Sequence, residues 1–231
     1  MLKSVPVIVC EDRREAIRHL LNSSTVNIII MDDGFQHRKV KRDLDIITIS
    51  ANDKKNNYRL LPWGRLREPL QNIKRAGALV FTKTENFTSP NIHVKVSSVF
   101  NGSPIFSTII PILMKYESSG YHKSLPLTIP LFAFCGIGEP ASFFKSIEQL
   151  DIRIGGKRIF PDHQKYTGSV INELSAQINS SQIKGIITTE KDLVKLPDSF
   201  LDEFDIYVIK IEMEFEDESG VLDLIQPLLQ P

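Results

Sequence analysis

The sequence predicts an α/β protein in which two α/β lobes are joined by a β-ribbon. Short apolar, β-branched runs alternate with segments of helical spacing, which is typical of parallel sheets. The pattern changes to that of extended strands between residues 93 and 124, and alternation then resumes. A chain of 231 residues can form one large domain or two small ones. We therefore predict a first lobe over 1–92, a ribbon over 93–124 and a second lobe over 125–231.

The first lobe contains four apolar runs and one segment with helical spacing. Residues 11–21 predict a helix, because Ala16, Ile17, Leu20 and Leu21 recur at helical intervals. Val26–Met31 is nearly unbroken and β-branched, which favours a strand buried on both faces. The other predicted strands are 6–10, 44–50 and 78–82.

The ribbon and the second lobe follow from the same kinds of pattern. A hairpin is predicted for the ribbon, with strands at 93–99 and 105–114 and a turn at Gly102-Ser103-Pro104. The predicted elements of the second lobe are strands at 131–135, 183–188 and 206–211 and helices at 141–150 and 219–229.

Composition excludes several classes of protein. Hydrophobic residues make up 42% and charged residues 24%, unlike collagen, coiled coils or disordered chains. The two cysteines, Cys10 and Cys135, cannot form a disulfide framework or a four-ligand zinc site, and they suit a reducing cytosol. No apolar run approaches the roughly 18 residues of a spanning helix, and the N-terminus lacks secretory-signal features. We expect a soluble chain or one that touches a membrane without crossing it.

The zero net charge conceals an uneven distribution. Residues 35–75 carry eleven Lys or Arg against four Asp or Glu, whereas residues 198–224 carry one basic and ten acidic residues. The pattern fits two oppositely charged solvated faces. It equally fits a basic surface that binds phosphates or an anionic membrane.

The first candidate site is the Asp32-Asp33-Gly34 junction that follows the predicted strand 26–31. Open α/β sheets bind ligands at the carboxyl ends of their strands, and a strand-end acidic residue helps to hold Mg²⁺ in P-loop NTPases. Neighbouring residues of a strand point to opposite faces, so only one carboxylate would face a metal. A simple Asx turn is the alternative.

Two further pairs could carry chemistry. Arg67 offers a planar fork for phosphate oxygens and Glu68 a hard oxygen ligand for Mg²⁺, although a surface ion pair before a helix is the favoured explanation when this pair is taken alone. In the stretch 160–166, Asp162 could tune the proton affinity of His163. Thr189 and Asp192 fit a helix cap better than a phosphate site.

Several chemical motifs do not occur in the 231 residues. Gly136-Ile137-Gly138 lacks the third glycine of a dinucleotide fingerprint. No GxSxG or HExxH segment is present, nor is the GxxxxGK[ST] phosphate-binding loop that a strand-end Asp pair would serve.

Taken together, these segments resemble the tetraacyldisaccharide 4′-kinases of lipid A biosynthesis. The resemblance spans nearly the whole chain, and the matching pieces occur in family order. These pieces are Asp12-Arg13, IIIMDDGFQHRKVKRDLDI (28–46), LLPWGRLREPL (60–70), FTKTE (81–85), FCGIGEPASFF (134–144), FPDHQKYT (160–167) and ITTEKDLVKL (187–196).

The resemblance implies an ATP- and Mg²⁺-dependent kinase with a P-loop-NTPase-like first lobe. Its substrate would be the 4′-hydroxyl of a tetraacyl glucosamine disaccharide 1-phosphate, at the inner face of the bacterial cytoplasmic membrane. The implied catalytic residues are Asp32, Asp33 and His163, the cofactor-binding residues Gln36 and Arg67, and the metal ligands Asp33 and Glu68.

The resemblance also has a gap. Relatives carry the P-loop on a segment before the point that matches Met1, so the first lobe is expected to be incomplete and the chain inactive alone, with a separately encoded segment as a possible partner. A remnant that binds glycolipid or protein without catalysis is the alternative. Nucleic-acid binding through residues 35–75 is a weaker one.

Overall fold

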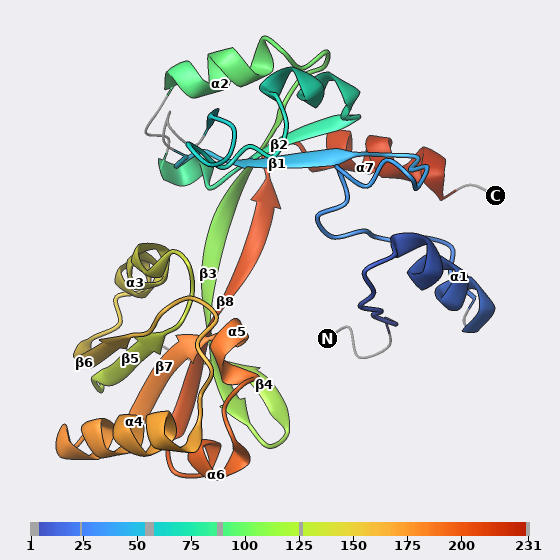
Figure 1. Cartoon of the computed structure of the whole chain (residues 1–231). Coiled ribbons are helices and arrows are strands. Elements are labelled where there is room, and N and C mark those ends of the chain that lie inside the picture. Colours follow the sequence, from blue (N-terminus) through green and yellow to red (C-terminus); the bar gives the residue numbers. More distant parts are fainter. Residues whose placement is uncertain (1–4, 24, 54–57, 87–89, 125–126, 230–231) are drawn as a thin grey trace. The chain divides into compact units, whose positions relative to one another are not determined.

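The computed structural model of the chain describes residues 5–23, 25–53, 58–86, 90–124 and 127–229, without the side chains of residues 86 and 90–93. The chain forms two compact α/β units (Figure 1). Unit 1 comprises Met1–Ile109 and Glu214–Pro231, and unit 2 comprises Ile110–Met213. Strands β3 (Ile105–Glu117) and β8 (Asp205–Phe215) each contribute to both units. The α/β class predicted from the sequence is confirmed, and the boundaries at 92/93 and 124/125 stay predictions.

Unit 1 is built on a short parallel sheet. Strand β1 (Ile46–Ser50) pairs in parallel with β2 (Ala78–Thr82), and β2 pairs with the start of β3. Both short strands lie where the sequence predicts them. The helices of unit 1 are α1 (Arg13–Ser23), η2 (Leu70–Arg75), η3 (Thr84–Asn86), α2 (Pro90–Ser97), α7 (Glu218–Ile225) and η4 (Gln226–Leu228).

The core of unit 1 is small. Leu79, Phe81 and Val96 are fully buried, and Phe81 stacks on Phe106 with ring centroids 5.6 Å apart. Ile49 of β1 and Leu70 and Ile73 of η2 complete the cluster. The core therefore depends on β2 and on the helical segments beside it.

Two strands predicted for the first lobe are wrong. Residues 6–10 and 26–31 are not strands in the structure, and Val9 and Ile30 are 93% and 91% exposed. An apolar run forms a buried strand only where a neighbouring strand accepts its backbone hydrogen bonds. Among the described residues, neither run pairs with a strand.

The strand predicted at 93–99 is also wrong, because α2 covers most of this segment. Val96, Val99 and Phe100 lie three and four residues apart and all pack in the core of unit 1. This spacing matches one face of a helix. Tertiary packing here outweighs the β-branched composition that suggested a strand. The predicted hairpin around 102–104 is wrong for the same reason, and only its second strand, within β3, is confirmed.

Unit 2 contains a larger parallel sheet. Strand β5 (Leu131–Cys135) lies between β6 (Ile154–Ile159) and β7 (Gly185–Thr189), and β7 pairs with β8, all in parallel. Strand β4 (Gly120–Lys123) forms an antiparallel hairpin with β3. The helices are α3 (Pro140–Gln149), α4 (Gly168–Ser180), α5 (Glu190–Leu193) and α6 (Asp198–Leu201). Strand β6 and helix α4 were missed by the sequence analysis, whereas α3, β5, β7 and part of β8 were predicted.

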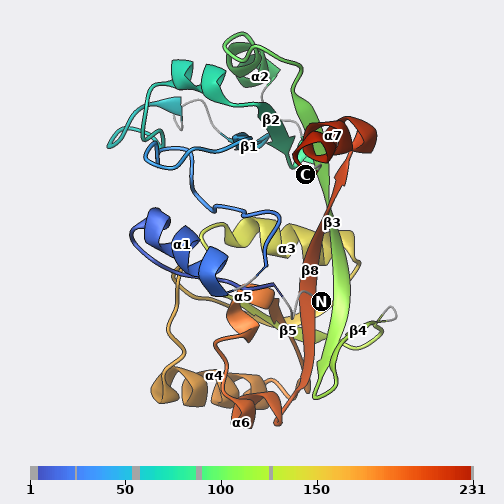
Figure 2. The ribbon, with the colours of Figure 1, turned by 90° about the vertical axis from the view of Figure 1, so that its right-hand side faces the viewer.

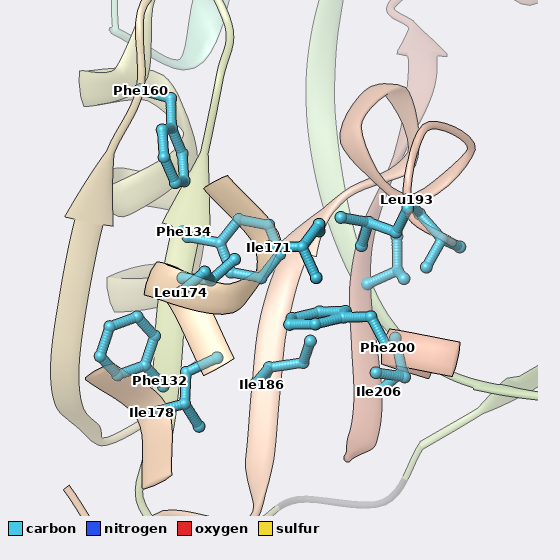
Figure 3. Close-up of a cluster of buried hydrophobic side chains, with 12 residues drawn as sticks. Phe132, Phe134, Phe160, Ile171, Leu174, Ile178, Ile186, Leu193, Phe200 and Ile206 are labelled. Carbon is cyan, nitrogen blue, oxygen red and sulfur yellow. The ribbon is translucent and has the colours of Figure 1, made fainter. Parts of the chain in front are cut away.

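Two apolar clusters cover the faces of the unit 2 sheet. Helices α3 and α4 lie on opposite sides of β5 (Figure 2). On the α4 side, Leu174 and Ile178 pack against Phe132 and Phe134, and all four are at most 1% exposed (Figure 3). Every residue of β5 is buried. The loops at the carboxyl end of this sheet therefore follow strands that are packed in the core of unit 2.

The two cysteines differ in accessibility. Cys135 is fully buried, and burial together with the charge of Asp192 raises the pKa of its thiol to about 11, whereas Cys10 is half-buried. Because a raised pKa keeps the thiol protonated until the pH approaches that value, Cys135 is unreactive at pH 8.

We expect a thiol-reactive dye to label Cys10 alone in the native chain and both cysteines in denaturant. Two equally fast thiols in the native chain would contradict this.

No helix within the described residues is long and apolar enough to span a bilayer.

Candidate active site

The Asp32-Asp33 pair lies in a tight turn of unit 1. Both carboxylates are exposed, and Asp33 has a left-handed backbone with φ of 53°. A Cβ atom on Gly34 would lie 3.0 Å from the Cβ atom of Met31, so glycine lets the chain close here. The chain thus turns at residues 32–33, and the Asx turn that the sequence left open as one alternative stays a prediction. The metal-binding role of the pair stays a prediction.

Arg67 brings a distant part of the chain to this turn. Its guanidinium donates to Oδ2 of Asp33, across 34 positions in the sequence. The side chains are 57% and 60% exposed. Exposed ion pairs contribute little to stability. The contact matters because it orients a planar cation beside the acidic turn.

Glu68 is the most heavily hydrogen-bonded carboxylate of the candidate site. Its side chain is only 16% exposed. Burial raises the pKa of the Glu68 carboxyl, but the amides of Asn72 and Gln36 and the cations of Arg75 and Arg38 outweigh burial, so the pKa lies below its ordinary value. The donor distances are 2.6 Å from Asn72, 2.8 Å from Arg75, 3.1 Å from Gln36 and 3.3 Å from Arg38.

These contacts bear on the metal site that the resemblance implies. Each oxygen of Glu68 already accepts two donors, and Asp33 is paired with Arg67. Within the described part of the chain, no group of three or more His, Cys, Asp or Glu side chains is arranged to hold a metal ion. A Mg²⁺ ion shared by Asp33 and Glu68 therefore does not fit the arrangement in this structure. Their metal-binding roles stay predictions.

A cavity of about 540 Å³ lies next to Gln36. It is bounded by the start of α1 and by the loop after the acidic turn. Its lining includes three arginines and a lysine against two carboxylates, so its balance is basic. The lining residues are Glu11, Asp12, Arg13, Arg14, Gln36, His37, Arg38, Lys39 and Val40.

Unit 2 holds the second set of predicted residues. His163 is 78% exposed, has φ of 57°, and places Nε2 3.6 Å from Oδ2 of Asp162. Oδ1 of Asp162 accepts from Nζ of Lys191 at 3.0 Å and from the His163 amide at 2.9 Å. The bond from Lys191, reinforced by His163, holds the pKa of the Asp162 carboxyl below its ordinary value. Asp162 therefore fixes the backbone of His163 and stays ionised.

A buried carboxylate connects the loops around His163. Asp192 is 0% exposed and accepts from the Gly136 amide and the Thr189 hydroxyl, both at 2.8 Å. Its own amide donates to Thr189, which confirms the predicted helix cap. A Cβ atom on Gly136 would lie 2.9 Å from the Cβ atom of Gln164, the neighbour of His163. The loops that follow β5 and β6 and the start of α5, which follows β7, are thus packed together.

The structure brings the predicted residues together in two groups. Asp33 meets Arg67, and Gln36 meets Glu68, within unit 1. His163 belongs to unit 2. The sequence analysis missed the partners of these residues, namely Arg38, Asn72, Arg75 and Lys191, and it identified Asp192 only as part of a helix cap. The i, i+4 spacing of Glu68 and Asn72 was the one available local signal.

The family model described as tetraacyldisaccharide-1-P 4′-kinase matches residues 1–230. The chain belongs to this family. The sequence resemblance described above is thereby confirmed.

Individual relatives agree with the family model. The tetraacyldisaccharide 4′-kinase of Chlorobium limicola is 34% identical over 194 residues, which cover 82% of this chain and 55% of the relative. That of Desulfotalea psychrophila is 33% identical over 210 residues, covering 90% and 60%. A crystal structure of the Aquifex aeolicus family member, described as an "apo" form in complex with ATP, matches with a TM-score of 0.61 and 29% identity, over 86% of this chain and 56% of that one.

The chain spans about 55–60% of the length of these relatives. The family and the fold are therefore known for these residues. The activity of a whole kinase of this family is a separate question for this chain.

Proposed function

We propose that these residues form the greater part of a lipid A 4′-kinase, which transfers the γ-phosphoryl group of ATP to the 4′-hydroxyl of a tetraacyl glucosamine disaccharide 1-phosphate. The observation that carries the proposal is the family match over residues 1–230. The contacts that join Asp33 to Arg67 and Gln36 to Glu68 across more than 30 positions support it. Each of these contacts puts residues of two family motifs side by side.

In the proposed reaction, the 4′-hydroxyl oxygen forms a bond to the γ-phosphorus as the bond to ADP breaks. His163 accepts the hydroxyl proton at Nε2, and Asp162 holds the backbone of His163 while it does so. Arg67, oriented by Asp33, faces phosphoryl oxygens, whose charge such a cation stabilises in the transition state. Gln36 borders the basic cavity, which offers room for an anionic ligand.

The family resemblance also implies a metal ion and a position at the membrane. Mg²⁺ would accompany ATP, and it would neutralise phosphate charge when bound. Asp33 and Glu68 are not its ligands in this arrangement, because cations or amides already occupy both carboxylates. Residues 35–75 are strongly basic, which suits a peripheral position at the inner face of the cytoplasmic membrane.

A GxxxxGK[ST] loop does not occur in the 231 residues, and such a loop cradles the transferred phosphate in P-loop kinases. We propose that catalysis requires a segment that supplies it, fused or separately encoded. The test compares this chain alone with a fusion to the loop-bearing N-terminal part of the Desulfotalea psychrophila relative. The readout is transfer of radiolabelled phosphate from ATP to the disaccharide lipid.

We expect no transfer by the chain alone and transfer by the fusion, with the Lys of the loop replaced by Ala as the matched negative control. Phosphate transfer by the chain alone would refute the need for the loop but would support the proposed kinase activity. A folded fusion that binds glycolipid without transferring phosphate would refute the proposed kinase activity. It would favour the alternative, a remnant that binds glycolipid without catalysis.

A further inference from the structure

The apolar loop, Leu60–Arg65, is a closed and ordered feature of unit 1. Leu60 and Leu66 form a bridge between their backbones. Hydrogen bonds of 2.9–3.0 Å run from the Leu61 amide to the Leu66 carbonyl, from Leu66 to Arg59, and from Trp63 to Leu60. The backbone therefore holds the tip in one conformation without burying its side chains.

The tip presents large apolar side chains to water. Leu60, Leu61 and Trp63 are 45%, 60% and 77% exposed. They form a contiguous Leu-Leu-Pro-Trp stretch, whereas scattered single exposed hydrophobic residues are ordinary on protein surfaces. A contiguous exposed apolar stretch with a fixed backbone indicates a surface that contacts a binding partner when the protein functions.

Two arginines stand at the base of the apolar loop. Arg59 is exposed and immediately precedes Leu60, and Arg65 is 77% exposed, with Asp53 at 3.7 Å as a distant partner. An apolar tip with cations at its base matches the layers of a bilayer edge, where acyl chains lie beneath anionic headgroups. Tryptophan is enriched at that boundary because its ring is apolar and its N–H remains hydrated.

A protein partner suits the loop less well. A stable protein interface buries about 800 Å² on each partner, and four consecutive residues cannot supply that area. We propose that the apolar loop inserts into the surface of a bilayer containing anionic lipid, with Leu61 and Trp63 at the headgroup–acyl boundary and Arg59 and Arg65 against lipid phosphates.

This inference rests on the proposed function, because the kinase reaction gives the membrane contact its purpose. The experiment that tests the contact does not depend on kinase activity. Arg67 follows Trp63 by four residues and pairs with Asp33. Docking of the loop would hold this pair close to the membrane surface. A disaccharide whose acyl chains remain in the bilayer would then reach it.

The chain provides its own probe. Trp63 is the only tryptophan, so the intrinsic tryptophan fluorescence comes from the apolar loop alone. Vesicles of phosphatidylethanolamine and phosphatidylglycerol should shift the Trp63 emission to the blue, and brominated acyl chains should quench it. Vesicles of phosphatidylcholine should do neither, and salt should weaken the response because it screens the arginines.

Variants separate the apolar and the charged contributions. Leu61→Ser combined with Trp63→Ser should lower vesicle co-sedimentation about tenfold or more, since the loop loses most of its insertable apolar surface. Arg59→Gln combined with Arg65→Gln should remove the preference for anionic vesicles. Leu228→Ser is the matched control, because it replaces a 42% exposed leucine of unit 1 outside the loop.

Unchanged Trp63 emission with anionic vesicles would overturn the inference. So would co-sedimentation of the Leu61→Ser, Trp63→Ser variant at the wild-type level, because another surface would then hold the membrane. Neither readout uses ATP or the disaccharide. A chain without kinase activity can therefore still pass this test, and an active fusion can still fail it.

Discussion

The Asp33→Asn variant is expected to lower the kcat of the loop-supplied fusion by about 10²–10³-fold, the size of effect seen when one preorganised electrostatic contact is lost. Asparagine keeps the shape of the turn but removes the charge that holds the Arg67 guanidinium. Arg67 then samples other rotamers and no longer meets the phosphoryl oxygens in a fixed orientation. The KM for ATP should change much less than kcat, because the contact acts mainly on the transition state.

Two comparisons make this prediction specific. Asp43→Asn removes an exposed carboxylate of the same unit and should leave kcat at the wild-type value. Arg67→Ala should cost at least as much as Asp33→Asn, because it removes the phosphoryl contact itself, and the double variant should cost little more than Arg67→Ala, because Asp33 acts through Arg67. Additive losses would refute the idea that Asp33 acts through Arg67.

The second large effect concerns stability. Asp192→Ala is expected to destabilise unit 2 by about 3 kcal/mol, because removing one partner of a buried network leaves the others unsatisfied. The Gly136 amide and the Thr189 hydroxyl lose their acceptor, and the Lys195 ammonium, 3.3 Å from Asp192, loses its counter-charge. Hydrogen exchange in β5 and β7 measures the change within unit 2 itself.

Glu148→Ala is the matched control for Asp192→Ala. Glu148 is an exposed carboxylate of α3, and its loss should change the free energy of unfolding by less than about 0.5 kcal/mol. Equal exchange rates in the Asp192→Ala variant and the wild type would show that the hydrogen bonds of Asp192 do not stabilise the unit.

The local sequence pattern was enough to predict the strands that pair with neighbouring strands of the same unit. Strands β2 and β5 are short apolar runs whose neighbours lie within the same unit, and both were predicted correctly. The run 26–31 is also mainly apolar, but most of it remains exposed. Composition indicates that a segment prefers burial but not whether a strand is available to pair with it.

The candidate site divides in a similar way. Its residue types and motifs were visible in the sequence, and Asp33, Arg67, Gln36 and Glu68 do meet in unit 1. Which side chain orients which could not be predicted, because the contacts cross more than 30 positions. Asp192 was recognised as part of a helix cap, whereas its bond to Gly136 depends on the order of the strands in the sheet.

That bond has a consequence for motion. Asp192 joins the loop after β5 to helix α5, and the loop after β6 packs against Gly136, so a movement of any one of these three segments acts on the other two. A backbone shift of Gln164 toward Gly136 would therefore press on the residue whose amide donates to Asp192. The histidine side chain is exposed to solvent, yet the residues on either side of it lie against a segment that is bonded to the buried Asp192.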